Sequence, residues 1–400
     1  MDEKTQPAAR SVLRRALSDR SVRAALFTFA LTRGLVFAIF VLATHFVTVG
    51  EPKRVGEFQE PVIELHGRSI VRNLRPLAYR GDGGWYIGTA SEGYERRPFD
   101  ATGQHNWAFF PLYPLLLRLA SAVTGGFQLT GMLLSTILFL PALVLLHKTA
   151  LAFGLDEDGA DRTIFYLATF PASYFFSLVQ TESLFLLTTV GSFYCAMRGR
   201  WWLAGALGAL ATATRFSGIF LLPALLLLYW KRHGLRPRAD ALGLLLIPAG
   251  LLAFMLYLHR LTGNAFAFKD VLVAWGRSTG LFLRPLFDYL VHFRVVNESW
   301  NFKLLNFLAA VLALGCAVVL VRRRQWAFAL YTLISIIAPL SSLLLQSHAR
   351  YVATIFPVFI VLAQAGGRSP RVDQTIRTVF IALLALMSAL FAAHFSMAMS

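Results

Sequence analysis

Five ionisable side chains stand apart in a chain that is otherwise mostly apolar. Asp82 lies in the glycine-rich stretch "YRGDGGWY", Glu182 in "VQTES", Arg215 in "ATRFSG", and His348 and Arg350 lie together in "QSHARY". A carboxylate can accept a proton, and arginine can bind phosphate through two parallel hydrogen bonds. The glycines beside Asp82 let the backbone come close to a ligand. These residue types suit proton abstraction beside a bound phosphate.

Each of these residues also has a simpler interpretation. Gly-Asp-Gly-Gly is a common turn sequence, and Glu182 at the start of a helix would suit the helix dipole. The two arginines and His348 could contact lipid head groups. The chemical interpretation therefore depends on whether the fold brings the five residues to one place.

The composition predicts an all-α, polytopic membrane protein. Of the 400 residues, 56% are hydrophobic and 15% are charged, and the mean hydropathy is +0.59. Many apolar runs approach the roughly 20 residues that cross a bilayer. The first run is too long for a signal peptide and no cleavage site follows it, so we expect a retained helix. About eleven crossings are predicted, in a range of roughly nine to twelve; they lie near residues 24–48, 128–147, 163–180, 182–197, 201–213, 216–230, 240–258, 303–321, 326–346, 350–366 and 376–395.

Basic residues set the expected orientation of these spans. The formal net charge is +17, but Lys and Arg lie mainly in short loops such as "MRGR", "KRHGLRPR" and "RRR". With the N-terminus in the cytoplasm, these loops all fall on the cytoplasmic side, as the positive-inside rule requires. We therefore expect no nucleic-acid partner. Cys195 and Cys316 lie in apolar runs and indicate no disulfide framework.

The predicted topology gives residues 1–400 as a single transmembrane domain with two long outer loops. These are residues 50–107 and 259–302, and loops of this length are commonly functional. Residues 108–123 contain two prolines and Arg118, and we expect an interfacial helix there. The five ionisable residues then fall on the non-cytoplasmic side, with Gln180 and Tyr351 beside them. Trp85 and Tyr86 either anchor the loop at the membrane interface or stack on a sugar ring.

An acidic cluster on the other side is the main competing site. The stretch "LDEDGADR" (residues 155–162) has an acidic D-x-D spacing that could hold a divalent metal ion. The same residues also suit the exposed start of a helix, where carboxylates favour the dipole, and we prefer that interpretation. The outer side shows no metal-binding motif, so we expect no cofactor and no metal requirement.

Five stretches in series resemble the PIG-V type of mannosyltransferase, from about residue 79 to residue 363. They are "GDGGWYIGTASEGY", "AFFPLYPLLLRLA", "TESLFLL", "ATRFSGIFLLPALLLL" and "RYVATIFPVFIVLA". The resemblance implies a GT-C membrane glycosyltransferase with a polyprenyl- or dolichyl-phosphate sugar donor, inversion at the sugar, and an aspartate of the first outer loop as catalytic base. By position that aspartate is Asp82. One departure is Gly81, where the family usually has tryptophan.

The resulting hypothesis is an inverting glycosyltransferase that transfers mannose to a lipid-linked or surface acceptor on the non-cytoplasmic face. In it Asp82 is the base, and the donor phosphate contacts Arg215, Arg350 and His348. Substrate contacts are expected from Glu182, Trp85, Tyr86, Tyr351 and Gln180. A prokaryotic plasma membrane is expected, or the endoplasmic reticulum in a eukaryote.

The alternative is a transporter or flippase of a lipid-linked sugar. A transport path needs ionisable groups through the depth of the membrane. The sequence has Arg33 near the middle of a span but shows no internal repeat.

Overall fold

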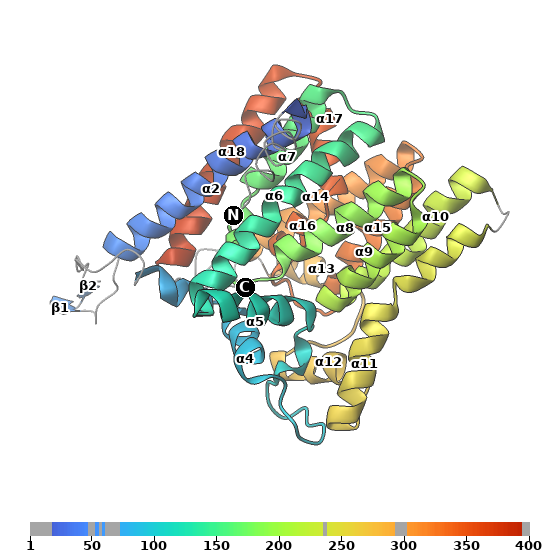
Figure 1. Ribbon diagram of the computed structural model, residues 1–400. Helices are drawn as coiled ribbons and strands as arrows, with labels where there is room; N and C mark the ends of the chain where they lie inside the picture. The colour runs from blue at the N-terminus through green and yellow to red at the C-terminus, as the bar shows by residue number, and fades with distance from the viewer. Residues whose placement is uncertain are drawn as a thin grey trace, which may run out of the picture.

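Helices form where the sequence is apolar, and each predicted span corresponds to one helix or to the pieces of a broken helix (Figure 1). The computed structural model describes residues 18–46, 53–55, 58–60, 73–234, 238–292 and 302–393. The bundle contains α2 (Arg20–Phe46), α6 (Gln128–Phe153), α7 (Glu157–Thr169), α8 (Glu182–Met197), α9 (Trp201–Thr214), α10 (Leu221–His233), α11 (Ala249–Thr262), α14 (Phe302–Arg322), α15 (Trp326–Leu340), α16 (His348–Thr354), α17 (Pro357–Gly366) and α18 (Pro370–Ala392).

The bundle has two chemically different ends. We call the end that carries Asp82, Glu182 and Arg350 the site end, and the other end the opposite end. Arginine-rich loops lie at the opposite end, where their side chains form hydrogen bonds to neighbouring helices. Arg232 donates to the carbonyl oxygen of Met197 at 2.9 Å, and Arg323 bonds Gln364.

Four helices are long and apolar enough to cross a membrane: α2, α6, α14 and α18. The number rises to six if two bent helix pairs each count as one span. The other predicted spans are shorter helices, such as the 16-residue α8. At about 1.5 Å per residue such a helix covers roughly 24 Å, less than the roughly 30 Å of a hydrocarbon core. Helical segments are therefore present at all eleven predicted crossings, but only four to six of them are long enough to span a membrane.

Helix breaks place irregular backbone inside the bundle. Helix α7 ends at Thr169, Pro171 follows, and a short 3-10 helix, η3 (Ser173–Ser177), leads to α8. Residues 171–186 are all buried. Non-helical backbone at membrane depth is tolerated where protein satisfies its polar groups. A second break separates α16 from α17, which meet at 82°.

The two long loops fold into small helices that pack together at the site end. The first loop contains η1 (Arg75–Tyr79), α4 (Gly83–Glu92) and η2 (Asn106–Ala108), and the second contains α12 (Ala267–Asp270), η6 (Val271–Trp275) and α13 (Arg284–Val291). Trp107 of the first loop and Phe268 of the second share one apolar cluster with α11. A two-stranded ribbon pairs β1 (Lys53–Val55) antiparallel with β2 (Phe58–Glu60). Residues 50–52, 56–57, 61–72 and 293–301 of the predicted loops lie outside the described residues.

The predicted interfacial helix is present as α5 (Leu112–Thr124). Its Leu115, Leu119 and Val123 are exposed, and their spacing of four residues places them on one face. This apolar stripe suits a helix that lies along a membrane surface, and the interfacial position stays a prediction.

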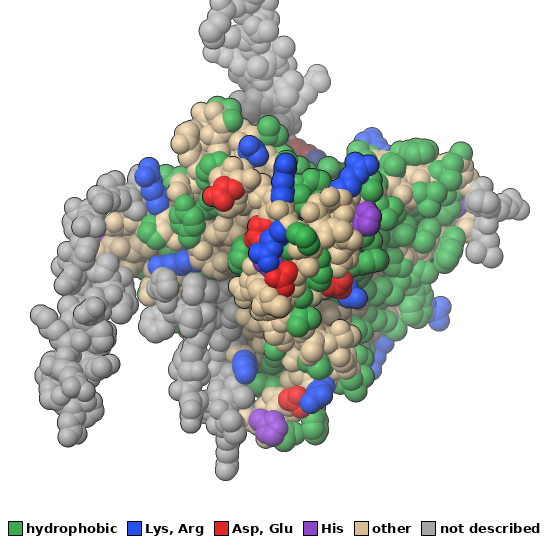
Figure 2. Space-filling model, turned by 90° about the horizontal axis from the view of Figure 1, so that it is seen from below, with side chains coloured by type: hydrophobic (Ala, Val, Ile, Leu, Met, Phe, Trp, Pro, Cys, Tyr) green, Lys and Arg blue, Asp and Glu red, His purple; other side chains and the backbone are tan. Residues whose placement is uncertain are grey.

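Exposed apolar surface is concentrated on the flank of the bundle. Seen from below, hydrophobic side chains cover the right side of the molecule, where α10 and α11 lie, whereas charged side chains gather nearer the centre (Figure 2). An apolar flank of this extent suits contact with lipid.

Candidate active site

Two glycines fix the turn that carries Asp82. Gly81 has a φ of 59°, in the left-handed region that other residues rarely occupy. Gly83 has no room for a side chain, because a Cβ there would lie 2.0 Å from the carbonyl oxygen of Ala78. The glycine at position 81, where the PIG-V pattern has tryptophan, therefore suits the conformation of this turn.

Asp82 occupies the N-cap position of α4, yet its carboxylate does not cap the helix. Instead, Oδ2 accepts a hydrogen bond of 2.6 Å from Nη1 of Arg350. The side chain of Asp82 is 35% exposed, whereas that of Arg350 is 6% exposed. Asp82 is thus the accessible member of the pair, and Arg350 fixes its orientation.

Arg350 uses all three of its nitrogens on acceptors. Besides the bond to Asp82, Nε donates to Oε1 of Glu182, and Nη2 donates to Oε1 of Gln180 at 2.6 Å. Its guanidinium also lies over the ring of Phe175, 4.9 Å from the centroid, in a cation–π contact. Three hydrogen-bond acceptors and one aromatic ring of the protein therefore fix the position of the Arg350 guanidinium.

Glu182 connects Arg350 to a second arginine. Its Oε1 also accepts from Nη2 of Arg215, while Nε of Arg215 donates to Oγ1 of Thr181 at 2.7 Å. Glu182 is fully buried, and its Oε2 has no hydrogen-bond partner among the described residues. The four residues Asp82, Arg350, Glu182 and Arg215 form one series of ion pairs, which we call the ion chain.

His348 and Tyr351 lie on the same short helix as Arg350 but outside the ion chain. His348 is buried, and its ring packs edge-on against Tyr351 with the centroids 5.9 Å apart. The hydroxyl of Tyr351 accepts a hydrogen bond of 3.0 Å from Nη2 of Arg277. The predicted residues thus gather in one region, but only part of them are connected directly.

Arg277 is a residue of this region that sequence reasoning missed. It follows η6 in the second loop and is half-buried. The nearby Tyr351 and, to a smaller extent, Asp82 raise the pKa of Arg277 above its ordinary value. Within the described ranges no carboxylate forms an ion pair with it. The sequence indicated only that residues 259–302 form a long loop, because spacing does not reveal which loop residue contacts Tyr351.

Trp85 and Tyr86 belong to an aromatic cluster that joins the two loops. Trp85 stacks on Phe109, with centroids 5.5 Å apart, and meets Trp275 of the second loop edge-on at 5.9 Å. Tyr86 packs edge-on against Phe109, and its hydroxyl lies 3.5 Å from that of Thr181. Burial raises the pKa of Tyr86 to about 12, so the phenol is neutral near pH 7. Both rings hold α4 in place beside the ion chain.

Arg33 is saturated by neutral oxygens. Nη1 donates to the carbonyl of Ser173 at 2.8 Å, and Nη2 donates to the carbonyl of Ala168 at 2.9 Å. The guanidinium lies over the ring of Phe139, 4.8 Å from its centroid. The buried guanidinium thus satisfies carbonyl oxygens at the C-terminal end of α7 and in the irregular segment that follows it.

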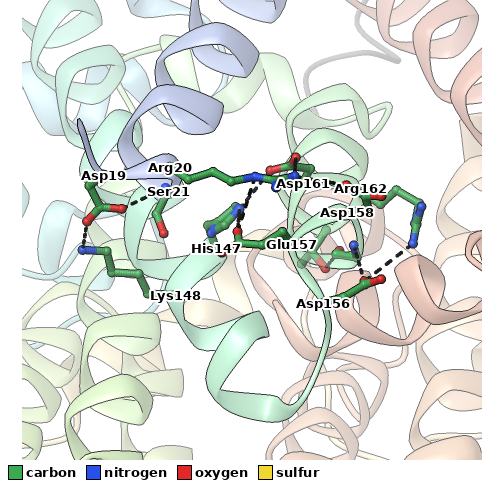
Figure 3. A network of polar contacts seen from close by, with 12 residues as sticks. Asp19, Arg20, Ser21, His147, Lys148, Asp156, Glu157, Asp158, Asp161 and Arg162 are labelled. Atoms are coloured by element: carbon green, nitrogen blue, oxygen red, sulfur yellow. Dashed lines mark hydrogen bonds and ion pairs between the residues drawn. The ribbon is translucent and has the colours of Figure 1, made fainter. Parts of the chain in front are cut away.

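The acidic cluster at the opposite end is occupied by cations of the chain itself (Figure 3). Arg20 donates to Asp158 at 3.0 Å and to Asp161 at 3.2 Å. His147 lies 2.9 Å from Asp161 through Nε2, and Asp156 caps α7 by accepting from the Gly159 N–H at 2.8 Å. The part of the chain that the structure describes has no group of three His, Cys, Asp or Glu side chains positioned to hold a metal ion. The position of these carboxylates at the start of α7, together with their ion pairs, therefore accounts for the acidic stretch.

Asp156→Ala is expected to lower the free energy of unfolding by about 1 kcal/mol, because the first turn of α7 loses its N-cap. Any activity located at the site end should remain at the wild-type level, with or without EDTA, because Asp156 lies at the opposite end of the bundle. Chemical denaturation and an activity assay measure the two effects. Loss of activity at unchanged stability, restored by a divalent metal, would instead assign the acidic cluster to a metal site.

Comparison with solved structures identifies the fold. The chain is similar to ArnT from Cupriavidus metallidurans, whose crystal structure was determined bound to undecaprenyl phosphate, with a TM-score of 0.53 and 14% identity over 89% of this chain and 63% of that one. The oligosaccharyltransferase of Archaeoglobus fulgidus in the apo form is also similar, with a TM-score of 0.45 and 10% identity over 93% of this chain and 56% of that one. The likeness to ArnT shows the fold alone, which is the GT-C fold.

The sequence comparison is narrower and more specific. Residues 66–233 match the family described as Mannosyltransferase (PIG-V), which confirms the predicted resemblance over that segment. A curated relative, GPI alpha-1,6-mannosyltransferase 2 of Cricetulus griseus, is 33% identical over 130 residues. That match covers 29% of this chain and 26% of the relative. The family match to residues 66–233 includes Asp82, Glu182 and Arg215 but not Arg277 or Arg350.

Proposed function

We propose that this protein is an inverting glycosyltransferase that uses a polyprenyl- or dolichyl-phosphate sugar, with mannose as the sugar and Asp82 as general base. The acceptor is a hydroxyl of a lipid-linked or surface molecule, and the reaction takes place on the non-cytoplasmic face. The proposal combines the GT-C fold with the match to the PIG-V family.

The observation that carries the proposal is the setting of Asp82. Its carboxylate is partly exposed and is bound on one oxygen by a buried arginine. It does not cap its helix. A carboxylate that is oriented by the protein and still accessible has the properties of a general base.

In the proposed reaction, Asp82 accepts the proton of the acceptor hydroxyl while that oxygen forms a bond to the anomeric carbon. The bond from the anomeric carbon to the phosphate oxygen breaks, and its electron pair stays on the phosphate. The products are the glycosylated acceptor and a polyprenyl phosphate. Attack opposite to the leaving group inverts the anomeric centre, through an oxocarbenium-like state.

The phosphate needs a cation that the protein has not already neutralised. Arg350 is engaged by Asp82, Glu182 and Gln180, and we assign it to positioning Asp82. Arg277 bonds only a neutral tyrosine hydroxyl in the described contacts, and it lies near enough to Asp82 to respond to its charge. We therefore take Arg277 as the principal phosphate contact. Arg215, which shares the carboxylate of Glu182 and is 15% exposed, and the buried His348 are retained as secondary contacts predicted from sequence.

Arg277→Gln is expected to lower kcat/KM for the lipid-phosphate donor about 30- to 100-fold, because a charge-assisted hydrogen bond to phosphate is lost. Tyr351→Phe removes only the hydroxyl that orients Arg277, so its effect should be several-fold smaller. Steady-state kinetics with varied donor measure both changes. Equal rates for Arg277→Gln and the wild type would remove Arg277 from the phosphate site.

The direct test of the proposed function is transfer of labelled mannose from synthetic polyprenyl-phosphate-mannose by the purified protein in liposomes. We expect a covalent glycosylated product that accumulates with time. Movement of the labelled donor across the bilayer without any covalent product would identify a flippase instead.

A further inference from the structure

We propose that the site end carries a binding site for one anionic phospholipid, formed by Arg96, Arg97 and Arg260. An open groove of about 620 Å³ lies between the first long loop and the C-terminal end of α11. Its lining is Arg96, Arg97, Pro98, Tyr257, Arg260, Leu261, Thr262 and Gly263. Three cations converge there from two separate segments of the chain.

Little of this positive charge is neutralised by the protein. Arg97 pairs with Asp100 at 2.7 Å. Neither Arg96 nor Arg260 forms an ion pair to a carboxylate among the residues that the structure describes. Both are exposed. The groove thus offers two unpaired guanidinium groups, which bind a phosphodiester well.

The walls of the groove are fixed relative to each other. The N–H of Phe99 donates to the carbonyl of Thr262 at 2.9 Å, which ties the first loop to the end of α11. Tyr94 packs edge-on against Tyr257 with centroids 5.6 Å apart. The arginines of the two segments are therefore held on a common frame.

The apolar face of α11 leads directly to the groove. Leu252 and Leu256 are exposed by 57% and 52%, and Arg260 follows at the same spacing of four residues. The three side chains lie on one face of the helix. Leucines of this exposure suit acyl chains, and an arginine at the end of such a stripe suits the head-group level. This continuity selects a lipid of the surrounding bilayer as the occupant.

The test is native mass spectrometry of the purified full-length protein titrated with phosphatidylglycerol or phosphatidylcholine. We expect the wild type to bind the first phosphatidylglycerol about tenfold more tightly than phosphatidylcholine, a difference of about 1.4 kcal/mol. The double variant Arg96→Gln/Arg260→Gln should lose this preference. The matched variant Arg118→Gln/Arg284→Gln removes two exposed arginines elsewhere at the site end and should keep it.

The outcome does not depend on sugar transfer, because lipid binding is measured directly. A thermal unfolding curve of each variant checks that the fold is intact. The proposal is overturned if the wild type shows no preference for phosphatidylglycerol, or if both double variants lose it equally.

Discussion

Replacing Asp82 by asparagine is expected to lower kcat by about 10³-fold, because the side chain keeps its shape but can no longer accept the proton of the acceptor hydroxyl. Asparagine retains an oxygen that can accept from Arg350, so the turn and the donor site should persist. The measurement is the rate of transfer of labelled mannose at saturating donor, together with donor binding by isothermal titration. We expect binding close to that of the wild type.

Asp100→Asn is the matched control for this experiment. Asp100 lies in the same loop and pairs with the exposed Arg97, so its amide should leave the transfer rate unchanged. Transfer by Asp82→Asn at the wild-type rate would show that another group removes the proton.

Replacing Glu182 by glutamine is expected to lower the free energy of unfolding by about 3–5 kcal/mol, because the buried Arg350 and the partly buried Arg215 lose their shared counter-ion. Oε1 of Glu182 accepts from both Arg215 and Arg350, and the side chain is fully buried. Arg350 would also lose one of the contacts that orient it toward Asp82. Denaturant unfolding followed by tryptophan fluorescence measures the stability change.

Two further variants define the origin of this effect. Asp288→Asn breaks an exposed pair with Arg284 and should change stability by less than about 0.5 kcal/mol. Glu182→Gln combined with Arg215→Gln removes one buried charge of each sign and should be less destabilised than the sum of the two single variants. Strict additivity would contradict the ion chain.

Much of the fold could be predicted from sequence because burial in a membrane depends on the local run of apolar residues. The span predicted at 128–147 is α6, and the span predicted at 182–197 is α8 with the same limits. The limits of a span were predicted less well where proline or glycine divides an apolar run into two helices. The span predicted at 350–366 is two helices at 82°, because Pro357 begins a new helix.

The clustering of the candidate site residues was predicted in part, and their roles stay predictions. Asp82, Glu182, Arg215 and Arg350 were chosen as charges on one expected side of the membrane, and they meet in the ion chain. Arg277 carried no such signal, because a basic residue in a long loop has many possible positions. Its partner Tyr351 is 74 residues away in the sequence.

The sequence by itself determined the all-helical membrane class, the positions of the helices and the resemblance to the PIG-V family. These depend on local hydrophobicity and on short motifs, which need no long-range geometry. The tertiary structure alone decided that Arg350 binds Asp82 across 268 residues, and that Glu182 is shared by two arginines. Ion pairs and hydrogen bonds require atoms within about 3 Å of each other. Only the packed bundle therefore specifies which charged side chains are partners. It also leaves Arg277 without a carboxylate partner among the described residues.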